Sequence, residues 1–170
     1  MTQKEINELS NNATMLAKDT LSAKLAQCFV TIKEKRYNFM SMTKFEAKFK
    51  KTKKKVAILG KTGSGNKSTG WEGTFSATMH YNTSILRELM EEFKNTGQDI
   101  YFETQILNYD PTSDAEMQEV DLVGCNLDEG ILAKFDATSD DSLDEDVSGT
   151  FEDFKIPRKF SMLEGMLKTS

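Results

Sequence analysis

The sequence predicts a mainly β (α+β) fold, a β-sandwich or barrel that carries one packed α-helix. Residues 71–81 alternate strictly between apolar and polar side chains, which indicates a strand with one buried face. Apolar residues then recur at helical spacing from residue 85 to residue 93. Most other apolar runs are short and are separated by turn-forming residues, as is typical of strands.

The helix is predicted directly after the alternating strand. Asn82, Thr83 and Ser84 are good N-cap residues, and Gly97 is a typical C-terminal stop. The apolar stripe consists of Ile85, Leu86, Leu89, Met90 and Phe93. The charged face consists of Arg87, Glu88, Glu91 and Glu92. We therefore expect the stripe to pack on the sheet and the charged face to meet solvent.

The other strands are predicted from short apolar segments. Residues 25–32 form one strand, the sequence KEKR turns the chain, and residues 37–49 form the next. After the helix, strands are predicted at residues 100–107, 119–127, 131–137 and 147–154. The sequence shows no internal repeat, and a length of 170 residues makes a single domain the expectation.

The composition is that of an ordinary, mildly acidic soluble domain. The chain has 170 residues, 29% of them charged, and a net charge of −5. This length can bury a core without a disulfide or metal. Cys28 and Cys125 form no CxxC pair and are expected to be buried, reduced thiols. No segment resembles a signal peptide or a membrane span, so we expect no stable membrane association.

The segment VAILGKTGSGNKSTG, which begins at Val56, looks at first like a phosphate-binding loop. That loop requires G-x-x-x-x-G-K-[ST], with a lysine directly after the second glycine. Counting from Gly60, Asn66 occupies the lysine position and Lys67 the hydroxyl position, and no other frame fits. A strand follows where a phosphate site would need a helix N-terminus. A flexible loop between two strands is the favoured interpretation.

The sequence predicts no catalytic, metal or cofactor-binding site, so we expect a protein that is not an enzyme. His80 is the single histidine and lies on the polar side of a strand, which excludes a histidine-based triad or a two-histidine metal site within one chain. Six acidic residues lie between Asp136 and Asp146, but they lack the D-x-[DN]-x-[DN]-G pattern of a calcium loop. We interpret them as a solvated acidic loop.

Two oppositely charged segments suggest contact between identical subunits. Six of the eight residues from Lys48 to Lys55 are lysines. This cluster could bind nucleic acid, remain solvated, or meet the acidic loop of another copy. Stacking aromatics are scarce within it and the domain is acidic overall, which disfavours nucleic acid. Head-to-tail contact between copies would bring the two charges together.

We assign two candidate surfaces on this basis. The subunit-interface loop comprises Lys50, Lys51, Lys53, Lys54, Lys55, Gly60, Gly63, Gly65 and Trp71. The acidic partner loop comprises Asp140, Asp141, Asp144, Glu145 and Asp146.

Three segments, taken in order, carry a family resemblance. They are KFEAKFKKTKKKVAILGKTGSGNKSTGWEGTFSATMHY, the helix TSILRELMEEFKNTG followed by DIYFETQI, and GTFEDFKIP. Together they resemble the tail tube proteins of contractile phage tails and of the phage-tail-like particles of defective prophages and tail-type bacteriocins. The resemblance covers residues 21–157 as the tail tube domain, and leaves residues 1–20 and 158–170 as terminal arms. The N-terminal arm, with Ile6, Leu9, Met15 and Leu16, could form an amphipathic helix or become ordered on assembly.

The resemblance implies a structural role. Such proteins form hexameric rings that stack into a rigid tube, and each subunit contributes strands to a shared β-barrel around a lumen. It implies that the helix packs outside and that the loop over residues 50–70 reaches neighbouring subunits. It also implies a sheath, a baseplate and a tail terminator protein as partners, and a place in the virion tail after assembly in the host bacterial cytoplasm. In a phage, DNA would pass through the lumen.

Two alternatives from other classes stay open. One is a small nucleotide-binding protein that uses the loop from Gly60 to Ser68. The other is a nucleic-acid-binding module that uses the lysine cluster from Lys48 to Lys55. Salt-dependent DNA binding would favour the second.

Overall fold

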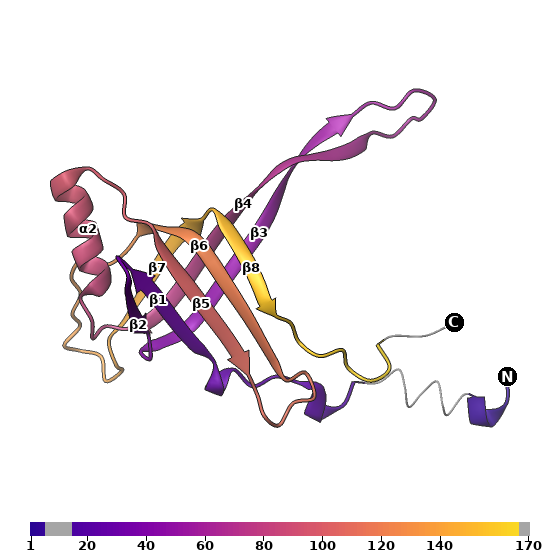
Figure 1. The fold of residues 1–170 in the computed structure, drawn as a ribbon, viewed down its shortest axis with the longest axis horizontal. Helices are drawn as coiled ribbons and strands as arrows, with labels where there is room; N and C mark the ends of the chain where they lie inside the picture. Colours follow the sequence, from indigo (N-terminus) through magenta and orange to yellow (C-terminus); the bar gives the residue numbers. More distant parts are fainter. Residues whose placement is uncertain (6–14, 167–170) are drawn as a thin grey trace.

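The computed structural model describes residues 1–5 and 15–166 (Figure 1). Ile6 and Leu9, two of the four apolar residues in the predicted N-terminal arm, lie outside the described residues. The first elements are the short 3-10 turns η1 (Ala17–Asp19) and η2 (Ala23–Leu25) and the strands β1 (Gln27–Ile32), β2 (Lys35–Asn38), β3 (Met42–Val56) and β4 (Gly65–His80). The helix α2 (Ile85–Thr96) follows, and then β5 (Phe102–Tyr109), β6 (Met117–Glu129), β7 (Asp144–Phe151) and β8 (Asp153–Arg158).

The strands form one antiparallel sheet that folds over itself into two layers. The order is β2-β1-β5-β6-β7-β4-β3, and β8 also pairs with β6. The beginning of β6 pairs with β5 and β8, whereas residues 126–129 pair with β7. β6 thus belongs to both layers and connects them. The core lies between the two layers. The predicted fold class, a mainly β sandwich with a packed helix, is confirmed.

The core follows the two-residue period of the strands. Phe75, Ala77 and Met79 of β4 are buried, as the alternation in the sequence predicted. They pack with Val147 and Phe151 of β7, and the opposite layer contributes the remaining buried strand residues. That second group comprises Cys28, Val30, Ile32, Phe102, Leu122 and Cys125.

The helix α2 has the predicted bounds. Ser84 is its N-cap and Gly97, with a φ of 69°, its C-cap. Gly97 adopts the left-handed conformation that glycine reaches at no steric cost. Leu86 and Leu89 are buried beneath the helix. Part of the predicted apolar stripe therefore packs on the body as expected, whereas Phe93, in the last turn of the helix, is 50% exposed.

Several predicted strand boundaries were wrong. Residues 131–137 form no strand, because β6 ends at Glu129 and the chain then leaves the sheet to pass beneath α2. The predicted strand over residues 37–49 is interrupted by a turn in which the Met42 N–H donates to the Phe39 carbonyl at 3.1 Å. The predicted strand over residues 147–154 breaks at Glu152, whose N–H donates to Val123 of β6 at 3.0 Å. This break lets β7 and β8 pair with different parts of β6.

Both terminal segments lie against the loop between β5 and β6. The carboxylate of Asp110 in this loop accepts hydrogen bonds from the Ser22 N–H at 2.8 Å and the Thr112 hydroxyl at 2.6 Å. The hydrogen bond from the Thr112 hydroxyl and those from the N–H groups of Ser22 and Thr112 together lower the pKa of Asp110. On the C-terminal side, the Ser161 N–H donates to Ala115 at 2.9 Å. The loop therefore holds residues from both ends of the chain.

Two glycines make room for aromatic rings of the neighbouring strand within the layer that contains β4 and β7. A Cβ at Gly149 of β7 would overlap the carbonyl oxygen of Asn126 and the ring of Phe75. A Cβ at Gly73 of β4 would overlap the ring of Phe151. The aromatic rings of the core thus occupy space that any other residue would need.

We predict that Gly149→Ala lowers the free energy of unfolding by about 1–3 kcal/mol, because the added methyl group overpacks the core. Gly70→Ala is the matched control on the same sheet, since nothing lies within 4 Å of its Cβ position. Urea denaturation followed by tryptophan fluorescence measures both variants. Equal stability of the two would contradict the predicted close packing.

Candidate functional site

The β3–β4 hairpin extends well beyond the body of the domain (Figure 1). Its strands pair from Met42, opposite Met79, to Val56, opposite Gly65. Only residues 57–64 connect them. The predicted loop over residues 50–70 is therefore corrected: most of it continues the two strands, because the lysine segment can pair along its backbone with the segment rich in Ser, Thr and Gly.

The structure distributes the predicted interface residues along this hairpin. Lys50, Lys51, Lys53, Lys54 and Lys55 lie on β3, Gly65 and Trp71 lie on β4, and Gly60 and Gly63 lie in the turn. Gly60 has a φ of 82°, which explains a glycine there. The segment from Gly60 to Ser68 thus runs into a strand, and its extended backbone from Gly65 onward lacks the arrangement of a phosphate loop, whose N–H groups converge at a helix N-terminus.

Aromatic side chains brace the hairpin where it leaves the body. Phe49 stacks on Trp71 with ring centroids 4.9 Å apart. Phe154 of β8 meets both rings edge-on, at 5.8 Å from Phe49 and 5.7 Å from Trp71. Offset and edge-to-face pairs of this kind are favourable arrangements. Trp71 therefore belongs to the base of the hairpin, where it packs within its own chain.

Beyond the brace, the hairpin carries charged and apolar groups that have no partner among the residues that the structure describes. The Lys50 ammonium lies 4.0 Å from Glu72, but no described carboxylate lies within 4 Å of the ammonium groups of Lys51, Lys53, Lys54 and Lys55. Near the turn, Leu59 is fully exposed, and Val56 and Ile58 are each 42% exposed. Exposed apolar residues grouped at one projecting tip are typical of a protein contact surface.

One face of the layer formed by β3, β4 and β7 is polar from end to end. The strand register places Lys44, Glu46, Lys48 and Lys50 of β3 on this face with Glu72, Thr74, Ser76, Thr78 and His80 of β4 and with Asp144, Asp146, Ser148 and Thr150 of β7. We call these residues the polar face. Asp146 accepts a hydrogen bond from the Thr78 hydroxyl at 2.6 Å, and Asp144 meets His80 Nδ1 at 2.7 Å. Four carboxylates against three lysines make this face mildly acidic.

The predicted acidic partner loop does not form one surface. Asp140 and Asp141 lie in the exposed loop before β7, whereas Asp144 and Asp146 lie on the polar face. Glu145 points the opposite way, because neighbouring residues of a strand face opposite sides. Its side chain is only 2% exposed. Glu145 is therefore removed from the candidate contact surface.

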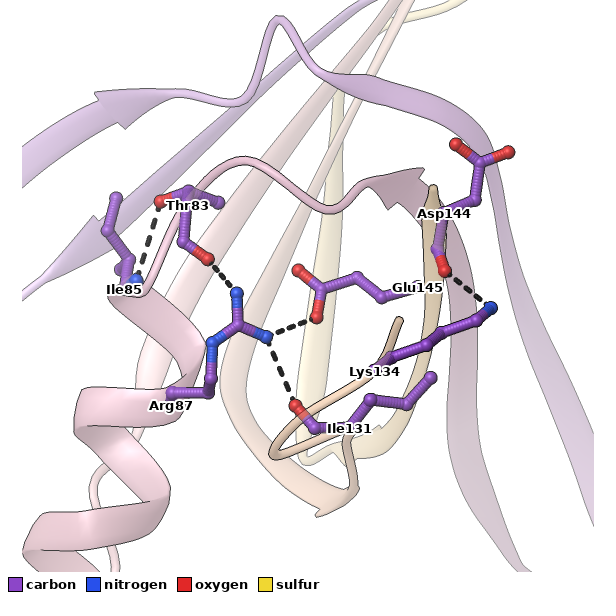
Figure 2. Close-up of polar contacts among 7 residues, drawn as sticks. All are labelled: Thr83, Ile85, Arg87, Ile131, Lys134, Asp144 and Glu145. Carbon is purple, nitrogen blue, oxygen red and sulfur yellow. Dashed lines mark hydrogen bonds and ion pairs between the residues drawn. The ribbon is translucent and has the colours of Figure 1, made fainter. Parts of the chain in front are cut away.

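Glu145 instead forms a buried ion pair with the helix α2 (Figure 2). The Arg87 Nη1 lies 2.6 Å from Glu145 Oε2 and donates to the Ile131 carbonyl at 3.1 Å. The second guanidinium nitrogen donates to the Thr83 carbonyl. The guanidinium carbon also lies 4.3 Å from the centre of the Tyr81 ring. Arg87 was predicted on the solvated face of the helix, but it ties α2 to β7 and to the chain that follows β6.

The two cysteines, Cys28 and Cys125, are both buried. Burial raises the pKa of Cys28 to about 12 and that of Cys125 to about 11, so both are neutral thiols, as expected. Within residues 1–5 and 15–166, no three His, Cys, Asp or Glu side chains gather so as to hold a metal ion. Over the same residues, no helix has the length and apolar character needed to cross a membrane.

Comparison with known proteins decides the family. Residues 13–158 match the family model described as "Phage tail tube protein". The chain belongs to the phage tail tube protein family. The match covers most of the chain and includes every element from η1 to β8. The predicted resemblance is thereby confirmed.

Two relatives of this tail tube protein come from Bacillus subtilis (strain 168). The phage-like element PBSX protein XkdM is 35% identical over 145 residues, which cover 85% of this chain and 95% of XkdM. The uncharacterized protein YqbM is 34% identical over 143 residues, which cover 84% of this chain and 94% of YqbM. Both alignments span nearly the whole relative, so the likeness concerns the complete domain.

Solved structures share the fold at low sequence identity. A chain of the anti-feeding prophage baseplate, determined with 6-fold symmetry, aligns with a TM-score of 0.63 and 10% identity over 89% of this chain and all of that chain. A chain of the sheath–tube complex of an extracellular contractile injection system aligns with a TM-score of 0.58 and 7% identity over 92% of this chain and 97% of that chain. These likenesses concern the fold alone.

In this tail tube protein, sequence reasoning located the hairpin but missed two features of the site. The polar face needs the register of three strands, which no single segment reveals. Arg87 carried a weak signal, since it stands between the buried residues Leu86 and Leu89. Its partner Glu145 lies 58 positions further along the chain, and nothing in the sequence around Glu145 indicates that it is buried.

We predict that Glu145→Ala lowers the free energy of unfolding by about 3–5 kcal/mol, because it leaves the largely buried charge of Arg87 without its partner. Asp141→Ala, which removes an exposed acid from the preceding loop, should change stability by no more than about 0.5 kcal/mol. Urea denaturation measures both. The double variant Arg87→Met with Glu145→Leu should recover most of the loss, and failure to recover would mean that other contacts of Arg87 dominate.

Proposed function

We propose that this tail tube protein is a structural, non-enzymatic subunit whose copies form hexameric rings that stack into a hollow tube. The observation that carries the proposal is the layer β3-β4-β7, which has one buried face, one polar face and a free edge. The sheet order ends at β3, so along its 15 residues only one edge is paired within the described chain.

A long free strand edge favours assembly. Its N–H and C=O groups are a template for pairing with another strand, and monomeric proteins usually block such edges. Closing the sheet through neighbouring copies satisfies those groups in one shared barrel. The apolar face of the layer is already covered by the other layer of the same chain, so ring formation needs no rearrangement of the core.

In this tube, the polar face lines the lumen. A barrel with a water-filled interior needs polar side chains on its inner face, and Ser, Thr and charged residues supply them here. Where the particle is a phage, the excess of carboxylates repels the phosphates of passing DNA and limits adhesion. The opposite layer, with α2 beside it, then faces outward.

The outward layer would meet the other components of a contractile tail. We expect a sheath protein around the tube and baseplate and terminator proteins at its ends. The fold relatives described as parts of a baseplate and of a sheath–tube complex support these partners. The subunit would reside in the virion tail after assembly in the host bacterial cytoplasm, and sheath contraction would drive the tube through the target envelope.

Negative-stain electron microscopy of the purified protein tests the proposal. Rings with six-fold symmetry or tubes built from them are the expected result, with or without a nucleating baseplate. A chain that stays monomeric in every condition, with no tubes in lysates of the producing cells, would overturn it.

We predict that reversing the charge of Lys53, Lys54 and Lys55 to Glu impairs ring stacking, because these lysines lie on the projecting hairpin and have no carboxylate partner in the described part of the chain. The tube yield by sedimentation should fall at least about tenfold, while the thermal midpoint of the monomer changes little. A variant with Lys35, Lys94 and Lys159 changed to Glu carries the same net charge and serves as control. Equal tube yields from both variants would assign the effect to net charge alone.

A further inference from the structure

Two acidic side chains lie next to each other on the outer face of β6. Glu119 and Asp121, which we call the acid pair, are two residues apart on this strand, so their side chains share one face of it. The next residue, Leu122, is buried in the core, so this face points away from the core. The two carboxyl groups lie within hydrogen-bonding reach of each other. A hydrogen bond between two carboxyl groups requires a proton on one of them.

The surroundings of the acid pair supply few donors for two ionised carboxylates. Asp121 is half-buried, and no hydrogen-bond donor among the described residues reaches its buried Oδ1 atom. The Gln105 amide donates to Glu119 Oε1, and the Arg36 guanidinium donates to Gln105 Oε1. The charge of Arg36 is thus relayed to Glu119 through a neutral amide. A poorly solvated carboxylate oxygen without a donor disfavours the ionised form of Asp121.

The charges on the neighbouring strands compensate the acid pair only in part. The charged residues that face it are Glu103 of β5, Asp153, Lys155 and Arg158 of β8, and Arg36 of β2. Burial first, then the charge and hydrogen bond of Glu119 and the charge of Glu103, raise the pKa of Asp121, and Lys155 opposes them with a smaller effect. The folded chain therefore holds this proton more tightly than the unfolded chain does.

Among the strands around the acid pair, β8 is the one held most weakly. It pairs with β6 alone, at the edge of its layer, whereas β5 is also held by β1 on its other side (Figure 1). The register between β6 and β8 shifts between Glu119 and Asp121, and Lys155 lies opposite Asp121. Repulsion within the acid pair is therefore relieved most easily by movement of β8. Because Phe154 of β8 braces Phe49 and Trp71, such movement would reach the base of the hairpin.

We propose that Glu119 and Asp121 share one proton and form a pH-sensitive latch, which holds β8 on β6 in mildly acid solution and loosens that pairing as the pH rises. With the proton bound, one carboxyl group donates to the other. Without it, two like charges lie side by side where solvent reaches them poorly. The stabilisation is fully present below the ordinary pKa of an aspartate and is lost as the pH rises through the higher pKa of the folded chain. The latch belongs to the single subunit and does not depend on the proposed tube.

Thermal unfolding of the full chain at pH 7 and at pH 4 tests the sign of this effect. Asp121→Asn keeps the size of the side chain and supplies an N–H donor in place of the shared proton. It should raise the midpoint relative to wild type by about 2–4 °C at pH 7 and by clearly less at pH 4. Asp128→Asn, the same change at an exposed position of β6, is the control and should show no such difference between the two pH values. An unchanged or lower midpoint of Asp121→Asn at pH 7, or an equal rise at both pH values, would overturn the proposal.

Carboxyl carbon NMR tests the sharing of the proton directly. Asp121 should titrate at a higher pH than an ordinary aspartate, and Glu119→Gln should lower the pH at which it titrates. Glu103→Gln removes a neighbouring acid that does not share the proton, so its effect on Asp121 should be smaller. A titration of Asp121 that Glu119→Gln leaves unchanged would refute the acid pair.

Hydrogen exchange locates the effect in the fold. At pH 7, amides of residues 153–158 should exchange at least about threefold more slowly in Asp121→Asn than in wild type, because the variant lacks the repulsion that loosens β8. Amides in the pairing of β4 with β7, which the acid pair does not touch, serve as the internal control and should exchange equally in both proteins. Equal exchange of residues 153–158 in the two proteins would refute the latch.

Discussion

The antiparallel pairing of β3 with β4 is the constraint on which the rest of the structure depends. Within the body, its two-residue period turns Phe75, Ala77 and Met79 into the core and leaves the intervening residues on the polar face. Beyond the body, the same pairing keeps lysines and exposed apolar side chains at a fixed distance from the core. One ribbon therefore builds the interior, a continuous polar surface and a projecting arm, and a slip of one residue would reverse its two faces.

Two different kinds of interaction hold β8 and α2 in place against the rest of the domain. Aromatic rings brace the ribbon where β8 crosses it, through Phe49, Trp71 and Phe154. On the helix side, Arg87 binds Glu145 and two backbone carbonyls, so its charge is shared among three acceptors. A buried pair of this kind adds little net stability over an apolar pair, but either partner alone is costly. Its contribution is thus to fix where α2 sits.

The sequence was sufficient to predict a strand or a helix wherever the signal came from neighbouring residues. Alternation identified β4, and cap residues identified both ends of α2. It failed where tertiary contacts decide: residues 131–137 have strand-like composition but pass under α2, and residues 50–56 resemble a loop but extend β3 because β4 pairs with them. Glu145 looked like one more exposed acid among six. Only strand register distinguishes it from Asp144 and Asp146, which face the other way.

The features that this chain leaves unsatisfied share one direction. The free edge of the ribbon belongs to β3, and the exposed lysines and the apolar tip lie at the projecting end of the same ribbon. A closed dimer with two-fold symmetry would pair like ends and bury only one kind of feature. A side-by-side ring, as proposed, would instead pair the β3 edge with a neighbouring copy. In the proposed tube, the free β3 edge would serve growth around the ring, and the projecting hairpin would give each ring two different faces.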